Sequence, residues 1–270
     1  MRFSFHESYA PGKDLGERLA RIRAAGFEWV ELDTKSVRQD RGRSAKRFLE
    51  AEGLRASALC GALTGSLLSD DRAVRQSAFD DLRALLETGG DLGAGGVVLA
   101  PLIGPPRLPD LSPWKSPGEV HRGLVTAYLE RLAEAAEKAG CSIWLEPLNR
   151  YRTHFLQRLD DARSICEEIG SDYIGVMADT FHMALEETDP FGALQRAGKR
   201  LRHVHAVDTN RRLPGQGMLD FRPVLRTLTA IGFSGCLSFE APVYGDFDSE
   251  VRAARALLES ILETLIDPAG

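Results

Sequence analysis

Apolar and polar positions follow two regular patterns that take turns along this chain. A short run rich in β-branched or aromatic residues leads into a polar loop, and a longer segment with apolar residues at helical spacing follows. The predicted strands are Arg2–His6, Glu28–Leu32, Arg55–Cys60, Val97–Pro101, Ser142–Pro147, Ile174–Asp179, Arg202–Val207 and Cys236–Glu240. Strands that alternate with helices predict a parallel sheet, and eight such units predict an α/β fold, a single (β/α)8 TIM barrel.

The ends of the predicted helices carry a consistent signal. Segments 15–27, 127–141, 161–170 and 224–233 place apolar residues three and four positions apart, and they reach Gly26, Gly140, Gly170 and Gly232, where left-handed caps are expected. No linker interrupts the rhythm, so we expect one domain over residues 1–270. The exception is the stretch 104–120, whose prolines and glycines predict a long irregular loop over the barrel mouth.

Composition narrows the classes of partner. The chain has 34 Lys and Arg against 39 Asp and Glu, a net charge of −5, which does not favour nucleic acid as a partner. The N-terminal segment lacks the pattern of a secretory signal, and no run approaches the apolar length of a membrane span. We therefore expect a cytoplasmic protein with no membrane partner. The four cysteines form no CxxC pair, which indicates reduced, structural thiols.

The two faces of the last four predicted strands differ in polarity. Residues i and i+2 of a strand share a face, and one face is apolar, as packing against outer helices requires: Ile143, Leu145, Ile174, Val176, Ala178, Val204, Ala206, Leu237 and Phe239. The other face carries Trp144, Glu146, Gly175, Met177, Asp179, His203, His205, Ser238 and Glu240. The inward face of a barrel therefore ends in charged groups, at the carboxyl end where barrels hold their sites.

Four of these inward residues form a candidate metal site. An acidic residue at a strand end is more often a helix N-cap or a surface group, but Glu146, Asp179, His205 and Glu240 end four consecutive predicted strands. A barrel cannot bury isolated carboxylates without a large desolvation cost, whereas a cation at the mouth offsets that cost. Three carboxylates and one imidazole suit Mn²⁺, Co²⁺ or Mg²⁺ better than a sulfur-rich zinc site does, and Zn²⁺ is not excluded.

Four short strings resemble a known family. LEPLNRY at 145–151, ADTFHM at 178–183, HVHAVD at 203–208 with NR and PGQG after it, and the glutamate that closes the eighth strand resemble the xylose isomerase-like sugar isomerase/epimerase superfamily. Within it, the chain is most similar to ketose 3-epimerases of the tagatose and psicose type and to inosose-dehydratase-like relatives. The similarity is dense from 144 to 240 and thinner before that.

The resemblance implies roles for individual residues. Glu146, Asp179, His205 and Glu240 would bind one divalent metal, Mn²⁺ being the first expectation. Glu146 and Glu240 would also act as acid and base on opposite sides of a carbon next to a carbonyl, with a metal-stabilised enediolate between the two proton transfers. His182 and Arg211 would contact substrate oxygens, and family members often form homo-oligomers. The expected substrate is a small ketose or keto-sugar.

Three further residues have two interpretations each. His182, three residues after Asp179, either reaches the substrate or bonds to backbone. Trp114 in the long loop either forms an apolar wall against a sugar or packs in an exposed loop. Arg152 stands where many ketose epimerases have a glutamate that contacts the sugar. An arginine there favours an acidic, phosphorylated or oxidised sugar through bidentate bonding, unless it points to solvent or pairs with a loop carboxylate.

Other functions remain open at this stage. The same chemistry can expel a β-leaving group, so a keto-sugar or inosose dehydratase or lyase is the main alternative. Apurinic endonucleases share the barrel but use several zinc ions and extra histidines near the third and fourth strand ends, where this chain has Cys60 and Pro101. A sugar-binding barrel without turnover is a further alternative, because an intact site does not prove catalysis.

Overall fold

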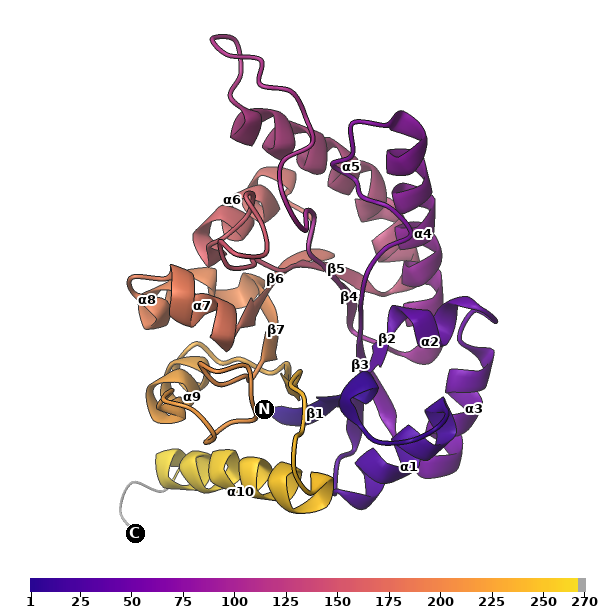
Figure 1. The fold of residues 1–270 in the computed structure, drawn as a ribbon, viewed down its shortest axis with the longest axis vertical. Helices are drawn as coiled ribbons and strands as arrows, with labels where there is room; N and C mark the ends of the chain where they lie inside the picture. Colours follow the sequence, from indigo (N-terminus) through magenta and orange to yellow (C-terminus); the bar gives the residue numbers. More distant parts are fainter. Residues whose placement is uncertain (267–270) are drawn as a thin grey trace.

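Eight parallel strands form a closed barrel in the computed structural model, which describes residues 1–266. The strands are β1 (Arg2–His6), β2 (Trp29–Asp33), β3 (Arg55–Cys60), β4 (Gly96–Leu99), β5 (Ser142–Leu145), β6 (Ile174–Asp179), β7 (Leu201–His205) and β8 (Cys236–Phe239). Figure 1 shows the strands at the centre and the helices around them. The predicted fold class is confirmed. The expected domain extends to residue 270, and residues 267–270 lie outside the described part.

The predicted strand bounds differ from the observed ones mainly at the mouth of the barrel. Three strands have the predicted bounds, but β5 ends at Leu145 and β8 at Phe239. Glu146 and Glu240 therefore follow the last strand residue. The chain leaves the sheet at Glu146 because Pro147, which has no N–H, cannot continue the hydrogen-bond ladder.

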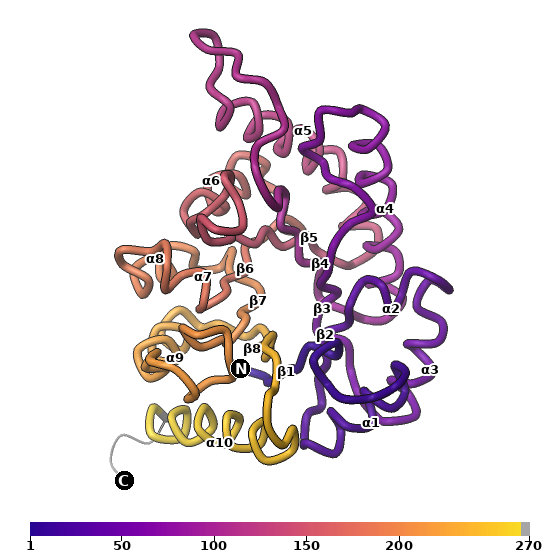
Figure 2. Tube along the Cα trace, in the orientation of Figure 1, coloured from indigo at the N-terminus to yellow at the C-terminus, as the bar shows by residue number. Residues whose placement is uncertain are grey.

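Within residues 1–266 the outer ring consists of eight helices, whose path Figure 2 traces. They are α1 (Leu15–Ala24), α3 (Arg43–Glu52), α4 (Arg72–Leu92), α5 (Pro117–Ala139), α6 (Leu159–Ile169), α8 (Pro190–Ala197), α9 (Phe221–Ala230) and α10 (Phe247–Ile266). Four short elements are η1 (Glu7–Tyr9), α2 (Thr34–Arg38), α7 (Thr180–Glu186) and η2 (Gly198–Arg200). The predicted glycine stops are confirmed, since Gly26, Gly140, Gly170 and Gly232 all have φ between 64° and 94°.

Apolar side chains pack on both sides of the barrel wall. The larger core lies between the strands and the helices and contains every residue of the predicted apolar face. A smaller cluster fills the barrel interior and consists of Ala58, Cys60, Val98, Trp144 and Met177. The predicted division of the strands into two faces is therefore confirmed. All four cysteines are buried and free, as expected for structural thiols.

The long loop between β4 and α5 takes a different path from the predicted one. Leu102 and Ile103, at its start, line a cavity at the barrel mouth. Arg107 lines the same cavity. The part of the loop beyond it extends outward, away from the barrel axis (Figure 1), and an isolated bridge between Leu111 and Lys115 folds it back on itself. The prediction that this loop covers the mouth is wrong beyond its first residues.

Within residues 1–266, no helix combines the length and the apolarity that a membrane span needs.

The barrel interior leaves no room for an added methyl group at Gly96. A Cβ at this residue would lie 2.4 Å from Cε2 of Trp144, and the Trp144 ring is stacked on His203 with 5.2 Å between ring centroids. We expect Gly96→Ala to lower the free energy of unfolding by about 1–3 kcal/mol through overpacking. Urea unfolding measures this value. Gly123→Ala is the matched control, because its Cβ would meet nothing within 4 Å. An equal effect of both substitutions would contradict the packing argument.

Candidate metal and substrate site

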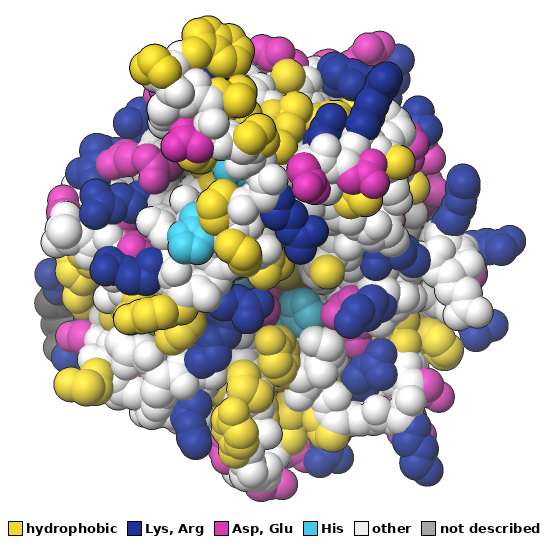
Figure 3. All heavy atoms as spheres, turned by 45° about the horizontal axis from the view of Figure 1, so that its top comes forward, with side chains coloured by type: hydrophobic (Ala, Val, Ile, Leu, Met, Phe, Trp, Pro, Cys, Tyr) yellow, Lys and Arg dark blue, Asp and Glu magenta, His cyan; other side chains and the backbone are white. Residues whose placement is uncertain are grey.

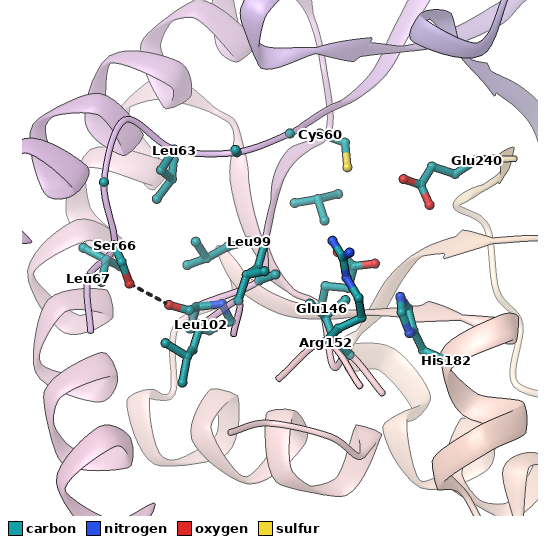
Figure 4. Close-up of a pocket in the computed structure, with 18 of the residues that line it drawn as sticks. Cys60, Leu63, Ser66, Leu67, Leu99, Leu102, Glu146, Arg152, His182 and Glu240 are labelled. Carbon is teal, nitrogen blue, oxygen red and sulfur yellow. Dashed lines mark hydrogen bonds between the residues drawn. The ribbon is translucent and has the colours of Figure 1, made fainter. Parts of the chain in front are cut away.

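A cavity of about 850 Å³ opens at the carboxyl ends of the strands. Figure 3 shows this face as hollowed, with histidine in the hollow and both acidic and basic side chains around it. Glu146, His182 and Glu240 line one end of the cavity (Figure 4), and Arg211 is also among the lining residues. Asp179 and His205 are buried beneath them, 1 % and 0 % exposed. The structure therefore brings the four predicted ligand residues together.

The His205 ring lies at the centre of this group. Its Nδ1 is 3.5 Å from Oε2 of Glu240, 3.7 Å from Oε1 of Glu146 and 3.8 Å from Oδ2 of Asp179. Its Nε2 lies 3.0 Å from Oε1 of Glu31, a hydrogen-bond distance. When Nε2 carries the proton and donates to Glu31, the lone pair of Nδ1 points toward the three carboxylates.

This donor set fits a divalent metal ion. Nδ1 of His205 is buried without a hydrogen-bond partner among the described residues. The nearest carboxylate oxygens lie 3.5–3.8 Å from Nδ1, which is too far for a hydrogen bond. Two ligand atoms that each lie about 2.0–2.2 Å from one ion would be separated by roughly 3 Å or slightly more. Asp179, His205 and Glu240 meet the geometric requirement for a shared ion, and so do Glu146, Asp179 and His182. Hard oxygen ligands with one imidazole suit such an ion.

Proton affinities in the site reflect burial and crowding of charge. Burial raises the pKa of Glu146 to about 8; the His205 ring opposes the rise, while Glu240 and Asp179 add to it. Burial also disfavours the charged form of Asp179, but His205, His182 and Arg211 hold the pKa of that carboxyl well below its usual range. Close carboxylates repel one another, so positive charge at this position stabilises the whole group.

Asp179 uses its two carboxylate oxygens differently. Oδ1 accepts hydrogen bonds from the backbone N–H groups of Phe181 at 2.8 Å and His182 at 3.3 Å, and so caps α7. Oδ2 is turned toward His205 and lies 3.0 Å from Nη1 of Arg211. The helix-cap interpretation and the site interpretation of this residue both hold.

Arg211 reaches the site from the loop after β7. Its guanidinium donates to Oδ2 of Asp179 and to Oε2 of Glu240, and its backbone has φ of 61°, which a non-glycine residue rarely adopts. Asp208 supports this conformation. Its carbonyl accepts from the Arg211 N–H at 2.9 Å, and its fully buried carboxylate accepts from the N–H groups of Gly215, Gly217 and Leu219. The conformation of the loop thus aims Arg211 at the carboxylates.

His182 lies in the first turn of α7 and not in a loop. Its Nδ1 accepts from the backbone N–H of Asn149 at 3.1 Å, and its Nε2 lies 3.8 Å from Oδ2 of Asp179. Burial lowers the pKa of His182 to about 4; Asp179 opposes this and Arg211 adds to it. Nε2 also lies 3.4 Å from Nη1 of Arg211, at the cavity that His182 lines. The two sequence interpretations, backbone bonding and contact with a ligand, are therefore compatible.

Arg152 and Trp114 differ in where the structure places them. Arg152 lines the cavity near Glu146 and His182 (Figure 4), and within residues 1–266 its guanidinium makes no hydrogen bond or ion pair. Trp114 is 72 % exposed in the outward part of the long loop and does not line the cavity. The apolar wall expected of Trp114 is formed by other residues, among them Leu102 and Ile103.

Two residues near the ligand group were missed by the sequence analysis. Glu31 is fully buried and lies 3.0 Å from His205 and 3.4 Å from Nε2 of His203; its charged side chain in the middle of a predicted buried strand was the available signal. Tyr9 lines the cavity, where burial and the nearby Glu240 raise its pKa to about 12. Glu31, His203 and His205 also satisfy the geometric requirement for a metal, although the Glu31–His205 contact is already a hydrogen bond.

The strand ends of this barrel carry a group of carboxylates and histidines that can hold a metal ion. Comparison with known protein families shows which family of barrel proteins the chain belongs to. A family described as xylose isomerase-like TIM barrel matches residues 19–263. The chain belongs to this family, and the resemblance drawn from its four strings is confirmed.

Similar proteins include several sugar epimerases. The chain is 30 % identical over 230 residues to a 3-dehydro-D-guloside 4-epimerase of Escherichia coli, covering 84 % of this chain and 87 % of that protein. It is 32 % identical over 245 residues to an L-ribulose 3-epimerase of Mesorhizobium japonicum, covering 88 % and 77 %. A crystal structure of a 3-keto-D-glucoside 4-epimerase from E. coli superimposes with a TM-score of 0.86 at 27 % identity, covering 96 % of this chain and 99 % of that one.

The Glu31–His205 hydrogen bond should control how well the site holds a metal. Glu31→Gln removes the negative charge that orients the ring and increases its basicity, so we expect Mn²⁺ affinity to fall about 10–100-fold. Isothermal titration calorimetry with Mn²⁺ measures this effect. Glu7→Gln is the matched control, a fully buried glutamate that bonds to Arg18 and Ser36 instead. Unchanged Mn²⁺ affinity in Glu31→Gln would show that the bond has no such role.

Proposed function

We propose that this protein is a divalent-metal-dependent epimerase that acts on a ketose or keto-sugar by removing and returning a proton next to the carbonyl. The observation that carries the proposal is the convergence of Glu146, Asp179 and Glu240 on Nδ1 of His205 at one end of the cavity. The similarity to ketose and keto-sugar epimerases supports the same reaction class.

Four residues are proposed as ligands of one metal ion: Glu146, Asp179, His205 and Glu240. Mn²⁺ is the proposed ion, with Co²⁺, Mg²⁺ and Zn²⁺ as alternatives. Such an ion would act as a Lewis acid toward the substrate carbonyl oxygen and a neighbouring hydroxyl oxygen. This would increase the acidity of the C–H bond on the hydroxyl-bearing carbon next to the carbonyl.

Glu146 and Glu240 are proposed as the acid and base. They follow β5 and β8, three strands apart around the barrel, and approach the same space from two directions (Figure 4). One carboxylate takes the proton from carbon, and the electron pair of the C–H bond moves toward the carbonyl oxygen. A proton from the other carboxyl group then adds to the opposite face of the carbon, which inverts its configuration.

The remaining polar groups are proposed to hold the substrate. Arg211 donates from the loop after β7, and the ring of His182 beside it contacts a substrate oxygen. Arg152, whose guanidinium makes no ion pair within residues 1–266, can bind a substrate carboxylate, phosphate or hydroxyl group. Trp114 remains a predicted contact, and its exposed position gives it no support.

The protein is further proposed to work as one domain, in the cytoplasm, on a small sugar. A homo-oligomer is proposed from the family resemblance. Within the fold, α10 packs the buried side chains of Val251, Ala254 and Leu258 against the barrel. The covered face of this helix therefore closes the chain's own core, so only its outer face is available for a contact with another subunit.

Solvent exchange tests the proposed chemistry. The Mn²⁺-loaded protein should incorporate deuterium from D₂O next to the carbonyl of ketoses or 3-keto sugars and yield a new stereoisomer, and removal of metal by a chelator should stop this exchange. Glu146→Gln and Glu240→Gln should each lower the exchange rate about 10²–10⁴-fold, as NMR can measure. Glu134→Gln, a surface substitution on α5, is the control. Retained exchange in both site variants would reject the assignment, and a dehydrated product would indicate a lyase.

Arg152 provides a separate test of substrate choice. If its guanidinium binds an anionic substituent, the parent protein should prefer keto-sugars with a carboxylate or phosphate over free ketoses. Arg152→Glu should lower kcat/KM for the anionic sugar at least about tenfold, because it removes a charge-assisted bond and adds repulsion. Arg226→Glu changes the same charge on the exposed face of α9 and should leave the preference intact. An unchanged preference in Arg152→Glu would mean that this side chain does not touch the substrate.

A further inference from the structure

The cavity has a second, apolar end. Leu63, Leu67 and Val74 approach it from the loop after β3 and the start of α4, and Leu102 and Ile103 approach it from the loop after β4. We call these five residues the apolar compartment. Figure 4 shows Leu63, Leu67 and Leu102 on one side of the cavity and Glu146, His182 and Glu240 on the other. The cavity therefore continues beyond the group that holds the proposed chemistry.

Its size exceeds what the proposed reaction needs. A volume of about 850 Å³ falls in the upper part of the range of about 300–1,000 Å³ that encloses drug-sized ligands. A single monosaccharide is smaller than such a ligand. With the reacting carbon next to Glu146 and Glu240, part of the cavity is left for a group attached to the sugar.

The walls of the compartment do not suit a second polar ring. Its side-chain hydroxyl, Ser66 Oγ, is already engaged with the Pro101 carbonyl and the Leu68 N–H. Arg107, on the loop after β4, also lines the cavity, but it is exposed and can keep its guanidinium in water. A sugar placed here would lose hydrogen bonds to water without replacement, at a cost of roughly 1–3 kcal/mol for each group. An apolar group would instead gain from its transfer out of water.

Hydrogen bonds between loops hold the compartment open. Ser66 Oγ links the loop after β3 to the Pro101 carbonyl (Figure 4). The Gly104 N–H donates to the Arg152 carbonyl at 2.7 Å, which ties the loop after β4 to the loop after β5. Ile103 is 50 % exposed although it is a large apolar side chain in a cavity wall. A preformed apolar space of this kind binds an apolar group at a low cost in ordering.

We propose that the substrate is a keto-sugar glycoside whose apolar aglycone occupies this compartment while the sugar ring lies against Glu146 and Glu240. This inference rests on the proposed function, because it takes the position of the sugar from the proposed acid and base. It goes further by assigning the apolar compartment to the group on the glycosidic oxygen, and it makes Leu63 and Ile103 residues that determine specificity.

Matched glycosides test the proposal. The methyl and phenyl glycosides of one 3-keto-hexose differ in the aglycone alone, and calorimetry with the Mn²⁺-loaded protein measures their affinities without requiring turnover. The phenyl glycoside should bind about tenfold more tightly or better, as burial of part of a ring predicts. Leu63→Ser and Ile103→Ser should each reduce this ratio about threefold or more. Leu111→Ser is the control, since Leu111 is 38 % exposed on the same loop as Ile103 but outside the cavity.

The outcomes separate this proposal from the proposed function. Equal affinities, weaker binding of the phenyl glycoside, no binding of either, or a ratio that both cavity variants leave unchanged would overturn the compartment assignment. Deuterium exchange on the same two compounds is measured in parallel. Preference for the phenyl glycoside without exchange would support the compartment and reject the epimerase, whereas exchange at equal rates with equal affinities would do the reverse.

Discussion

The structure depends most on how it balances the charge of carboxylates buried at the barrel mouth. Glu146, Asp179 and Glu240 lie close together around His205. Burial and the two neighbouring carboxylates raise the pKa of Glu146. Two features counter this cost. The Arg211 guanidinium bonds to Asp179 and Glu240, and Glu31 orients His205 so that an imidazole nitrogen faces all three carboxylates. The position of each group follows from this balance, and so does the suitability of the site for a divalent ion.

The sequence predicted the barrel and the ligand group because both depend on local patterns. Alternation in each strand separates the apolar face from the inward face, and parallel strands place their carboxyl ends at one rim, so Glu146, Asp179, His205 and Glu240 had to converge. The role of Glu31 could not be found in the same way. Its partner His205 is 174 residues away, and their contact requires closure of the barrel. A register shift at Val30/Glu31 also moves β2 against β3, which strand periodicity does not reveal.

Loop positions were less predictable than strand ends. Trp114 was expected at the cavity, yet its loop extends outward after Arg107 and leaves Trp114 exposed. The path is set by contacts that are remote in sequence, such as the hydrogen bond between Gly104 and Arg152 and the one between Ser66 and Pro101. The conformation of Arg211 is a similar case. Its left-handed backbone depends on a loop organised by the buried Asp208 carboxylate. No spacing of residue types in the sequence indicates that Asp208 has this role.

The hydrogen bond between Ser66 and the Pro101 carbonyl links two loops and no strand. The strand ends position the carboxylates and His205, whereas loops tied in this way set the shape of the space beyond them. These two parts of the molecule can therefore change independently over evolution. Insertions or replacements in the loops after β3 and β4 would alter which compounds fit the cavity, while the carboxylates and His205 at the strand ends would stay in place. One barrel framework can thus give rise to enzymes that share their chemistry and differ in their substrates.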